Sequence, residues 1–287
     1  RRIPFVFEVR DQWPEIPIEM GIIKNPLLKA VLLWLEKRIY RSSAAIVALS
    51  PGMAQGVKNV LKSEAKEIII APNSSDTQLF RADVDSSLMR EQLGWQNKFV
   101  VLHFGAMGKA NGLDFLVEAA LRLKENPNIH FVLIGEGREK SRLRKKVKDL
   151  NLRNMEVLDA FAKSQMPQVV AACDVSTVIF ADYSILEHNS ANKFFDSLSA
   201  GKPILLNYSG WQRDIIEEYG CGYGIKQGDF DDYINKLLRL FENRDSLKEM
   251  SQNARHLAEK EFNRDIISNR IFTLIDKMHR NQKRNNT

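Results

Sequence analysis

Residues 187–206 have the sequence EHNSANKFFDSLSAGKPILL, which predicts a loop, a short helix, a Gly-Pro stop and a buried strand. At helical spacing, Lys193 and Asp196 share one face of this helix, and Phe194 and Leu198 lie on the opposite face. We expect the apolar face to pack on a sheet. The other face then presents one cation and one carboxylate beside a helix N-terminus, whose free N–H groups favour an anion. The stretch therefore predicts a site for a phosphorylated, hydroxyl-rich ligand at the carboxyl edge of a sheet.

The chain from residue 99 onward repeats the same alternation of apolar strand and helix. Strands are predicted at residues 99–104, 129–134, 154–158, 175–179, 204–207 and 223–226, with helices between them and closing helices at residues 231–241, 246–262 and 264–280. Strands that are apolar throughout and separated by helices indicate a parallel sheet covered on both faces. Six such strands predict one Rossmann-like domain, with ligands bound at the carboxyl ends of its strands.

The first part of the chain predicts a smaller sheet. Three short strands are expected at residues 3–9, 44–49 and 67–71, with helices near residues 26–41 and 51–62. Three strands are too few for a doubly wound domain, so we expect part of a larger domain without its front half. Residues 81–98 are polar and are expected to link the domains and to merge into the first helix of the second. The predicted divisions are residues 1–80, 81–263 and, as a closing helix and polar tail, 264–287.

The composition of the chain is typical of a soluble globular protein, with 44% hydrophobic and 27% charged residues among 287. No apolar run reaches the ~18 residues that a membrane span needs. No leader segment is expected, because the chain opens directly on a strand-like run. Cys173 and Cys221 lack metal-ligand spacing and are expected to be buried thiols in a reducing cytoplasm.

The basic residues are unevenly distributed. The formal net charge is +6, and seven basic residues lie between Arg138 and Lys148. Two interpretations of this run stay open: a solvated surface helix, or peripheral contact with an anionic membrane at its inner face. Nucleic acid is not expected as a partner, since no aromatic residues interleave the basic run and no recognition motif is present.

Further candidate residues follow the predicted strands. The loop Gly105-Ala-Met-Gly108-Lys109-Ala-Asn111-Gly112 offers glycines for close backbone approach and a lysine for a phosphate, although its spacing differs from GxGxxG. The alternative for this loop is a plain strand-to-helix turn. Gly135 either lines a nucleotide or belongs to a tight turn. Phe161 either stacks on a base or belongs to the core.

Three stretches resemble family-four glycosyltransferases of the GT-B fold. NKFFDSLSAGKPILL, residues 192–206, resembles their donor-site helix, and FEVRDQWP, residues 7–14, resembles a stretch of the bacterial members that build surface polysaccharides. PNSSDTQLF, residues 72–80, resembles PNGVDxxxF at the end of their N-terminal domain. The resemblance implies an α/β fold with two Rossmann-like domains and parallel sheets, of which the N-terminal domain is incomplete in this chain.

The resemblance also implies roles for single residues. Members carry two acidic residues separated by seven others, of which the first meets the donor sugar and the second meets the ribose of the nucleotide. Asp196 stands at the second position, and Glu187 lies next to the first, which is His188 here. Asp11 would face the cleft between the domains. The residues implied for holding the nucleotide are Gly105, Gly108, Lys109, Gly135, Phe161, Asn192 and Lys193.

The implied function is transfer of a sugar from a nucleotide diphosphate sugar, expected to be a UDP-sugar, to a saccharide or lipid-linked saccharide acceptor with retention. No metal and no cofactor are expected, and the sequence shows no His/Cys cluster. Ala106 and Asn111 stand where the family commonly has Arg and Lys, so Lys109 is expected to take over one charge. Two alternatives stay open: a sugar-nucleotide 2-epimerase of similar architecture, and a subunit that binds a nucleotide sugar without turning it over.

Overall fold

The computed structural model describes residues 3–62 and 64–285, with side chains described as far as residue 280. These residues form two compact units. Unit 1 comprises the chain up to Ser74, the segment Tyr183–Ser190 and the chain from Arg264 on, and unit 2 comprises Ser75–Asp182 and Ala191–Asn263. Residues 286 and 287 of the predicted polar tail lie outside the described residues.

The sheet of unit 2 is parallel throughout. Within the described residues it has six strands, in the order β6-β5-β4-β7-β8-β9. The chain therefore moves outward from β4 in one direction, returns to β7 and moves outward in the other. The strands are β4 Phe99–Phe104, β5 Ile129–Ile134, β6 Met155–Leu158, β7 Val175–Val178, β8 Ile204–Leu206 and β9 Gly222–Gly224.

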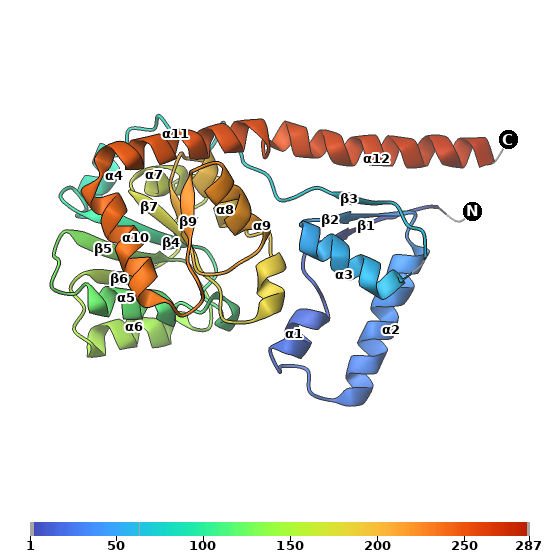
Figure 1. Cartoon of the computed structure of the whole chain (residues 1–287), viewed down its shortest axis with the longest axis horizontal. Helices are drawn as coiled ribbons and strands as arrows, with labels where there is room; N and C mark the ends of the chain where they lie inside the picture. Colours follow the sequence, from blue (N-terminus) through green and yellow to red (C-terminus); the bar gives the residue numbers. More distant parts are fainter. Residues whose placement is uncertain (1–2, 63, 286–287) are drawn as a thin grey trace. The chain divides into compact units, whose positions relative to one another are not determined.

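Helices cover both faces of this sheet (Figure 1). Alternate residues of β4 point to opposite faces: Phe99 and Val101 join a buried cluster with α5, α6 and α10, and Val100 and Leu102 join one with α4 and α7. The predicted parallel sheet with two covered faces is confirmed. The helices are α4 Ser87–Gln92, the 3-10 helix η1 Lys109–Asn111, α5 Asp114–Arg122, α6 Lys140–Asp149, α7 Met166–Ala171, α8 Asn192–Ser199, α9 Trp211–Glu218, α10 Phe230–Glu242 and α11 Arg244–Lys260.

Unit 1 has a smaller parallel sheet, which the described residues form with three strands in the order β1-β2-β3. Tyr40 and Met53 pack with Ile46 on one face of β2, and Ile267 and Leu274 pack on its other face. The closing helix α12 is thus part of unit 1. The elements of unit 1 are β1 Val6–Val9, β2 Ala45–Ala48, β3 Ile68–Ile70, α1 Glu15–Glu19, α2 Pro26–Ser42, α3 Pro51–Leu61, the 3-10 helix η2 Ser184–His188 and α12 Arg264–Asn285.

The structure differs from the predicted linker. Residues 81–98 contain α4, and Trp95 is buried in the core of unit 2, where its indole Nε1 donates a hydrogen bond to Glu156 Oε1 at 2.7 Å. The chain passes between the units at Ser74 and Ser75 instead.

The packing of α8 also differs from the predicted one. Its polar face does not face solvent as a whole: Ser197 is fully buried, and its Oγ lies 2.6 Å from Ser176 Oγ on β7. Phe194 and Phe195 pack around Trp211 of α9 and Phe262. The assumption that only the apolar face packs was wrong, because a small serine lets the helix approach the strand closely on that side too.

Candidate functional site

The candidate site of unit 2 lies where the strand order reverses, between β4 and β7. Open parallel sheets bind ligands outside the carboxyl ends of their strands at this point. The loop after β4 begins at Gly105, and α8 begins at Asn192 after the segment that follows β7. Both belong to unit 2.

Lys193 lies against the backbone of Gly105. A Cβ at Gly105 would be 3.3 Å from Lys193 Cε, and φ at this glycine is +115°, so a larger residue would both strain the turn and crowd the lysine. Burial lowers the pKa of Lys193 to about 7. Among the described residues, no carboxylate lies within ion-pair distance of Lys193 Nζ. Its ammonium therefore lacks a protein counter-ion and suits an anionic ligand.

A histidine provides the polar contact of this lysine. Lys193 Nζ lies 3.1 Å from His103 Nε2, and His103 is completely buried at the end of β4. Burial, with a smaller contribution from the charge of Lys193, holds the pKa of His103 well below its usual value. The sequence does not mark His103 as a site residue, because His103 stands in the apolar strand sequence FVVLHF and has no motif around it.

The N-terminus of α8 is open to an anion. Its N-cap residue, Ala191, has no side-chain hydrogen-bond acceptor, and Asn192, the first helical residue, is exposed. Among the first-turn amides, the Phe194 N–H bonds only to the Ala191 carbonyl, in a 3-10-type contact. Uncapped N–H groups and the helix dipole favour negative charge at this position.

The glycines of the neighbouring loops serve the packing of the backbone. A Cβ at Gly135, whose φ is +147°, would overlap the carbonyl oxygen of Gly105, so the loops after β4 and β5 meet backbone to backbone. The Gly108 N–H donates to Asn111 Oδ1 at 3.0 Å and is therefore engaged within its own turn. Both glycines therefore have a structural role in tight turns, which is one of the two interpretations that the sequence leaves open.

Asp196 lies one turn beyond Lys193 and is half-buried. Burial first, and the Asp76 carboxylate second, raise its pKa to about 7, against a smaller opposing effect of Lys163. The predicted cation and carboxylate therefore share a helix but do not pair, since no ion pair between them occurs among the described side chains. Asp76 and Lys163 were not selected from the sequence, because they come from separate segments that only the fold brings to Asp196.

Two other predicted site residues, Phe161 and Lys109, differ in how exposed their side chains are. Phe161 is half-buried and packs against the cluster of Trp95 and Val169, which favours the core alternative. Lys109 is exposed in η1, where its side chain is accessible to a ligand.

Glu187 and Asp11 belong to unit 1. Glu187 lies in η2. The Glu19 carboxylate holds this turn, because it accepts hydrogen bonds from Ser184 Oγ and from the Ile185 N–H, at 3.2 Å each. Ser50 Oγ donates to the His188 carbonyl on the far side of this turn. Asp11 is exposed at the bend after β1 and lines a hollow of about 120 Å³. The structure therefore places Glu187 and Asp196 in different compact units.

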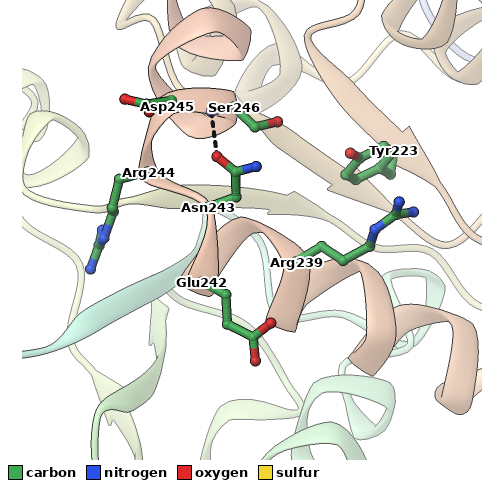
Figure 2. Close-up of a pocket in the computed structure, with 7 residues that line it drawn as sticks. All are labelled: Tyr223, Arg239, Glu242, Asn243, Arg244, Asp245 and Ser246. Atoms are coloured by element: carbon green, nitrogen blue, oxygen red, sulfur yellow. Dashed lines mark hydrogen bonds between the residues drawn. The ribbon is translucent and has the colours of Figure 1, made fainter.

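A larger hollow lies at the turn from α10 to α11, with a volume of about 620 Å³ (Figure 2). Asn243 Oδ1 accepts from the Ser246 N–H at 2.9 Å and caps α11, as the dashed line in Figure 2 shows. Arg244 points away from Tyr223 and lies over the ring of Phe99, the first residue of β4. Asn243 and Arg244 are thus engaged within the fold, and Phe99 places the hollow near the amino ends of the strands, away from the candidate site.

The described residues contain no group of three or more His, Cys, Asp and Glu side chains placed to hold a metal ion. The sequence has two Asp-x-Asp stretches, and both are engaged locally. Asp83 pairs with Arg81 at 2.6 Å, and Asp85 accepts from the Ser87 N–H at 2.9 Å. Asp229 accepts from the Asp232 N–H at 2.9 Å, and Asp231 pairs with Arg122 at 2.8 Å. Cys173 and Cys221 are buried free thiols, as predicted.

Comparison with known proteins matches this chain to one family. The profile of the family described as "Glycosyl transferases group 1" matches residues 85–257. WcaI of Escherichia coli (strain K12), named as a colanic acid biosynthesis glycosyl transferase, is 34% identical over 118 residues, which are 40% of this chain and 29% of the relative. The spore coat protein SA of Bacillus subtilis (strain 168) is 26% identical over 197 residues, 66% of this chain and 52% of the relative. The chain thus spans about half or less of the length of these two curated relatives.

A solved structure shares the fold. The crystal structure of HepE from Anabaena, in complex with UDP and glucose, has a TM-score of 0.79 and 21% sequence identity, and the match covers 96% of this chain and 72% of that chain. At this identity the likeness concerns the fold. The expected α/β architecture with parallel sheets is that of this solved protein.

Proposed function

Because this chain belongs to the group 1 glycosyl transferases, we propose that it takes part in moving a sugar from a nucleotide diphosphate sugar to a saccharide acceptor. One observation carries the proposal: the Lys193 ammonium, without a protein counter-ion, lies beside the uncapped N-terminus of α8 at the strand-order reversal. A diphosphate supplies the negative charge that this position lacks. HepE was solved with UDP and glucose, which supports a UDP-sugar with a hexose as the donor.

The chemistry of transfer follows from that charge. As the bond from the anomeric carbon to the diphosphate breaks, negative charge accumulates on the leaving phosphate. Lys193, the amides at Asn192 and the exposed Lys109 would stabilise it. Asp196 would accept hydrogen bonds from the ribose. The backbone at Gly105, Gly108 and Gly135 remains a proposed contact of the nucleotide, and so does the part of the Phe161 ring that its core packing leaves exposed.

The finer steps rest on the resemblance to family-four enzymes. We propose retention at the anomeric carbon, with Glu187 meeting the hydroxyls of the donor sugar and Asp11 facing the acceptor. We also propose transfer without a metal ion, in which the placed positive charge acts in its stead. A lipid-linked saccharide is the proposed acceptor, in keeping with relatives such as WcaI, whose name refers to colanic acid.

Product analysis with an isotopically labelled UDP-hexose, a saccharide acceptor mixture and this protein tests the proposal. The expected result is a labelled glycoside whose anomeric configuration matches the donor, formed equally well with and without a chelator. A labelled epimer of the donor would instead indicate a 2-epimerase. The positive control is a longer relative, assayed with the same donor and acceptor. If this protein binds the donor but forms no product in the presence of acceptor, it is a non-catalytic subunit.

We further propose peripheral contact with an anionic membrane, through α2 rather than through the basic helix α6. The basic residues of α6 are largely compensated by carboxylates. Lys145 pairs with Asp149 and Lys146 pairs with Asp114, each at 2.6 Å, and Arg144 pairs with Asp159 at 3.2 Å. A paired helix of this kind attracts an anionic surface only weakly.

The outer face of α2 combines apolar and basic side chains. Leu27, Val31 and Trp34 recur at helical spacing and are 73%, 51% and 62% exposed. Arg38 continues the same face, with its guanidinium 5.8 Å from the centre of the Trp34 ring. Exposed apolar residues with an interfacial tryptophan and flanking cations fit a lipid headgroup region. In the part of the chain that the structure describes, no helix is both long and apolar enough to cross a bilayer.

A further inference from the structure

A buried histidine stands behind the lysine of the candidate site. His103 is completely buried at the end of β4, between Leu102 and Phe104. An imidazole at such a position costs free energy unless its nitrogens find partners. Its Nε2 lies 3.1 Å from Lys193 Nζ, and backbone groups of Ala106 and Thr177 also lie beside the ring. Among the described side chains, Lys193 is the polar partner of this ring.

The nature of the partner matters for the charge of the lysine. A carboxylate next to Lys193 would also orient the ammonium, but it would cancel the positive charge that a phosphate needs. A neutral imidazole accepts the N–H of the ammonium through the lone pair of Nε2 and leaves the net charge in place. Burial keeps His103 in its neutral form, because its pKa lies well below the usual value.

We propose that His103 is a positioning residue for the diphosphate, whose neutral Nε2 holds the Lys193 ammonium beside Gly105 and leaves its positive charge to the ligand. The inference rests on the proposed function, since it needs a diphosphate at Lys193. It also requires a definite tautomer, with the proton of His103 on Nδ1. A positioning histidine of this kind acts through the lysine and touches no reacting atom.

Two substitutions of His103 separate this role from a structural one. His103→Leu removes the acceptor, and His103→Gln keeps an acceptor oxygen within reach of Lys193. Calorimetric titration should show UDP binding roughly 10-fold or more weaker for His103→Leu, the size expected for a hydrogen bond to a charged group, and close to wild type for His103→Gln. Binding of uridine, which lacks the phosphates, should be unchanged in both. Equal losses for UDP and uridine, or no loss for UDP, would overturn the proposal.

The control is Ser176→Ala, which removes another buried polar contact, the one between Ser176 and Ser197, without touching Lys193. It should bind UDP like the wild type. A wild-type protein that does not bind UDP would refute the proposed function itself and is thereby distinguished from failure of the His103 assignment.

The tautomer of His103 can also be tested in the wild-type protein, so this test does not depend on whether a variant folds. Nitrogen-15 NMR of the histidines, with His103 assigned, should show a neutral ring protonated on Nδ1 from pH 5.5 to 8, both free and with UDP. A ring that is protonated on both nitrogens, or on Nε2 alone, would contradict acceptance from Lys193.

Discussion

Lys193 is in the first turn of α8, Lys202 follows the helix, and the two have different partners. Lys202 Nζ donates to the carbonyls of Ala171 and Cys173, at 2.7 and 2.8 Å, and so satisfies the C-terminal end of α7. Lys193→Ala should weaken UDP binding roughly 10-fold or more, with little change in stability. Lys202→Ala should lower the free energy of unfolding by ~1 kcal/mol and leave UDP binding unchanged. Calorimetric titration measures UDP binding, and denaturant unfolding measures stability. Equal effects of the two substitutions on UDP binding would refute the assignment of Lys193.

The pKa values of Lys193 and Asp196 predict how donor binding depends on pH. Lys193 must be protonated to bind the diphosphate, and burial lowers its pKa to about 7, so binding should weaken as pH rises above 7. Asp196 must be ionised to accept from the ribose, and burial raises its pKa to about 7, so binding should weaken as pH falls below 7. Titrations with a UDP-sugar from pH 5.5 to 8.5 should therefore give a maximum near neutrality. Asp196→Asn should remove the acidic limb alone; a limb that persists unchanged in this variant assigns it to another group.

The buried Glu36, beside the half-buried Glu15 in unit 1, predicts a second pH effect, on stability. Burial first, and the Glu15 carboxylate second, raise the pKa of Glu36, which is 6% exposed. Glu36 thus stays protonated in the folded protein at pH values where the unfolded chain has released this proton. Stability should fall as pH rises above the ordinary value of 4.5, by up to about 1.4 kcal/mol per pH unit. Glu36→Gln should flatten this slope in urea unfolding between pH 5 and 8, and an unchanged slope would contradict the raised pKa of Glu36.

The residues of the site differed in how well the sequence revealed them. Lys193 and Asp196 stand in a helix whose spacing and neighbouring Gly and Pro mark it clearly. His103 gave no signal, since one polar residue in an apolar strand is normally a core position. Asp76 and Lys163 reach Asp196 from distant segments, so their effect on its pKa depends on tertiary structure that spacing alone does not encode.

The regular elements followed the sequence closely because their patterns are local. The predicted strands at residues 99–104 and 129–134 match β4 and β5 to the residue, and α2 differs from its predicted range by one residue. The packing partners of the elements were harder to predict. The basic run of α6 pairs with Asp114 and Asp159, which precede and follow it by many residues. Charge counted along the sequence therefore overstated the charge that this surface presents.

The contacts of the turn η2 were likewise not predictable from local sequence patterns, and they lead to a further prediction. Its partners Ser50 and Gly52 stand more than 130 residues earlier, and a Cβ at Gly52 would overlap the His188 ring. Gly52→Ala should loosen η2, which carries Glu187, and lower transfer while α3 stays helical. Gly56→Ala is the matched control in the same helix, because its Cβ meets only the flexible tip of Gln12. Hydrogen exchange should quicken at residues 184–188 in the first variant only. Exchange unchanged in both would show that Gly52 does not hold this turn.

At the scale of the whole molecule, the two units divide the chain in an order that the sequence did not show. Tyr183–Ser190 leaves unit 2 after β7 and belongs to unit 1, and α12 returns to the sheet of unit 1. Hydrogen bonds from Asn73 to Ser190 hold the first of these segments. A boundary that the chain crosses several times has no compositional signal, because each crossing is set by contacts between residues far apart in sequence.

Association of the molecule with membranes tests the surface of α2. Wild-type protein should co-sediment with vesicles rich in anionic lipid at low salt and dissociate in part at high salt, since basic residues near the surface contribute ~1 kcal/mol each and salt screens them. Trp34→Ser combined with Val31→Ser should reduce binding strongly by removing apolar area from the interface.

Leu88→Ser provides the control for that experiment, because Leu88 is an apolar residue of unit 2 that is 71% exposed on α4. It should bind vesicles like the wild type. Lys145→Gln, on the compensated helix α6, should also have little effect, since its charge is already paired with Asp149. Loss of binding in Lys145→Gln with normal binding in the α2 variant would move the contact to α6. A wild type that stays in the supernatant at low salt would remove membrane contact from the proposal altogether.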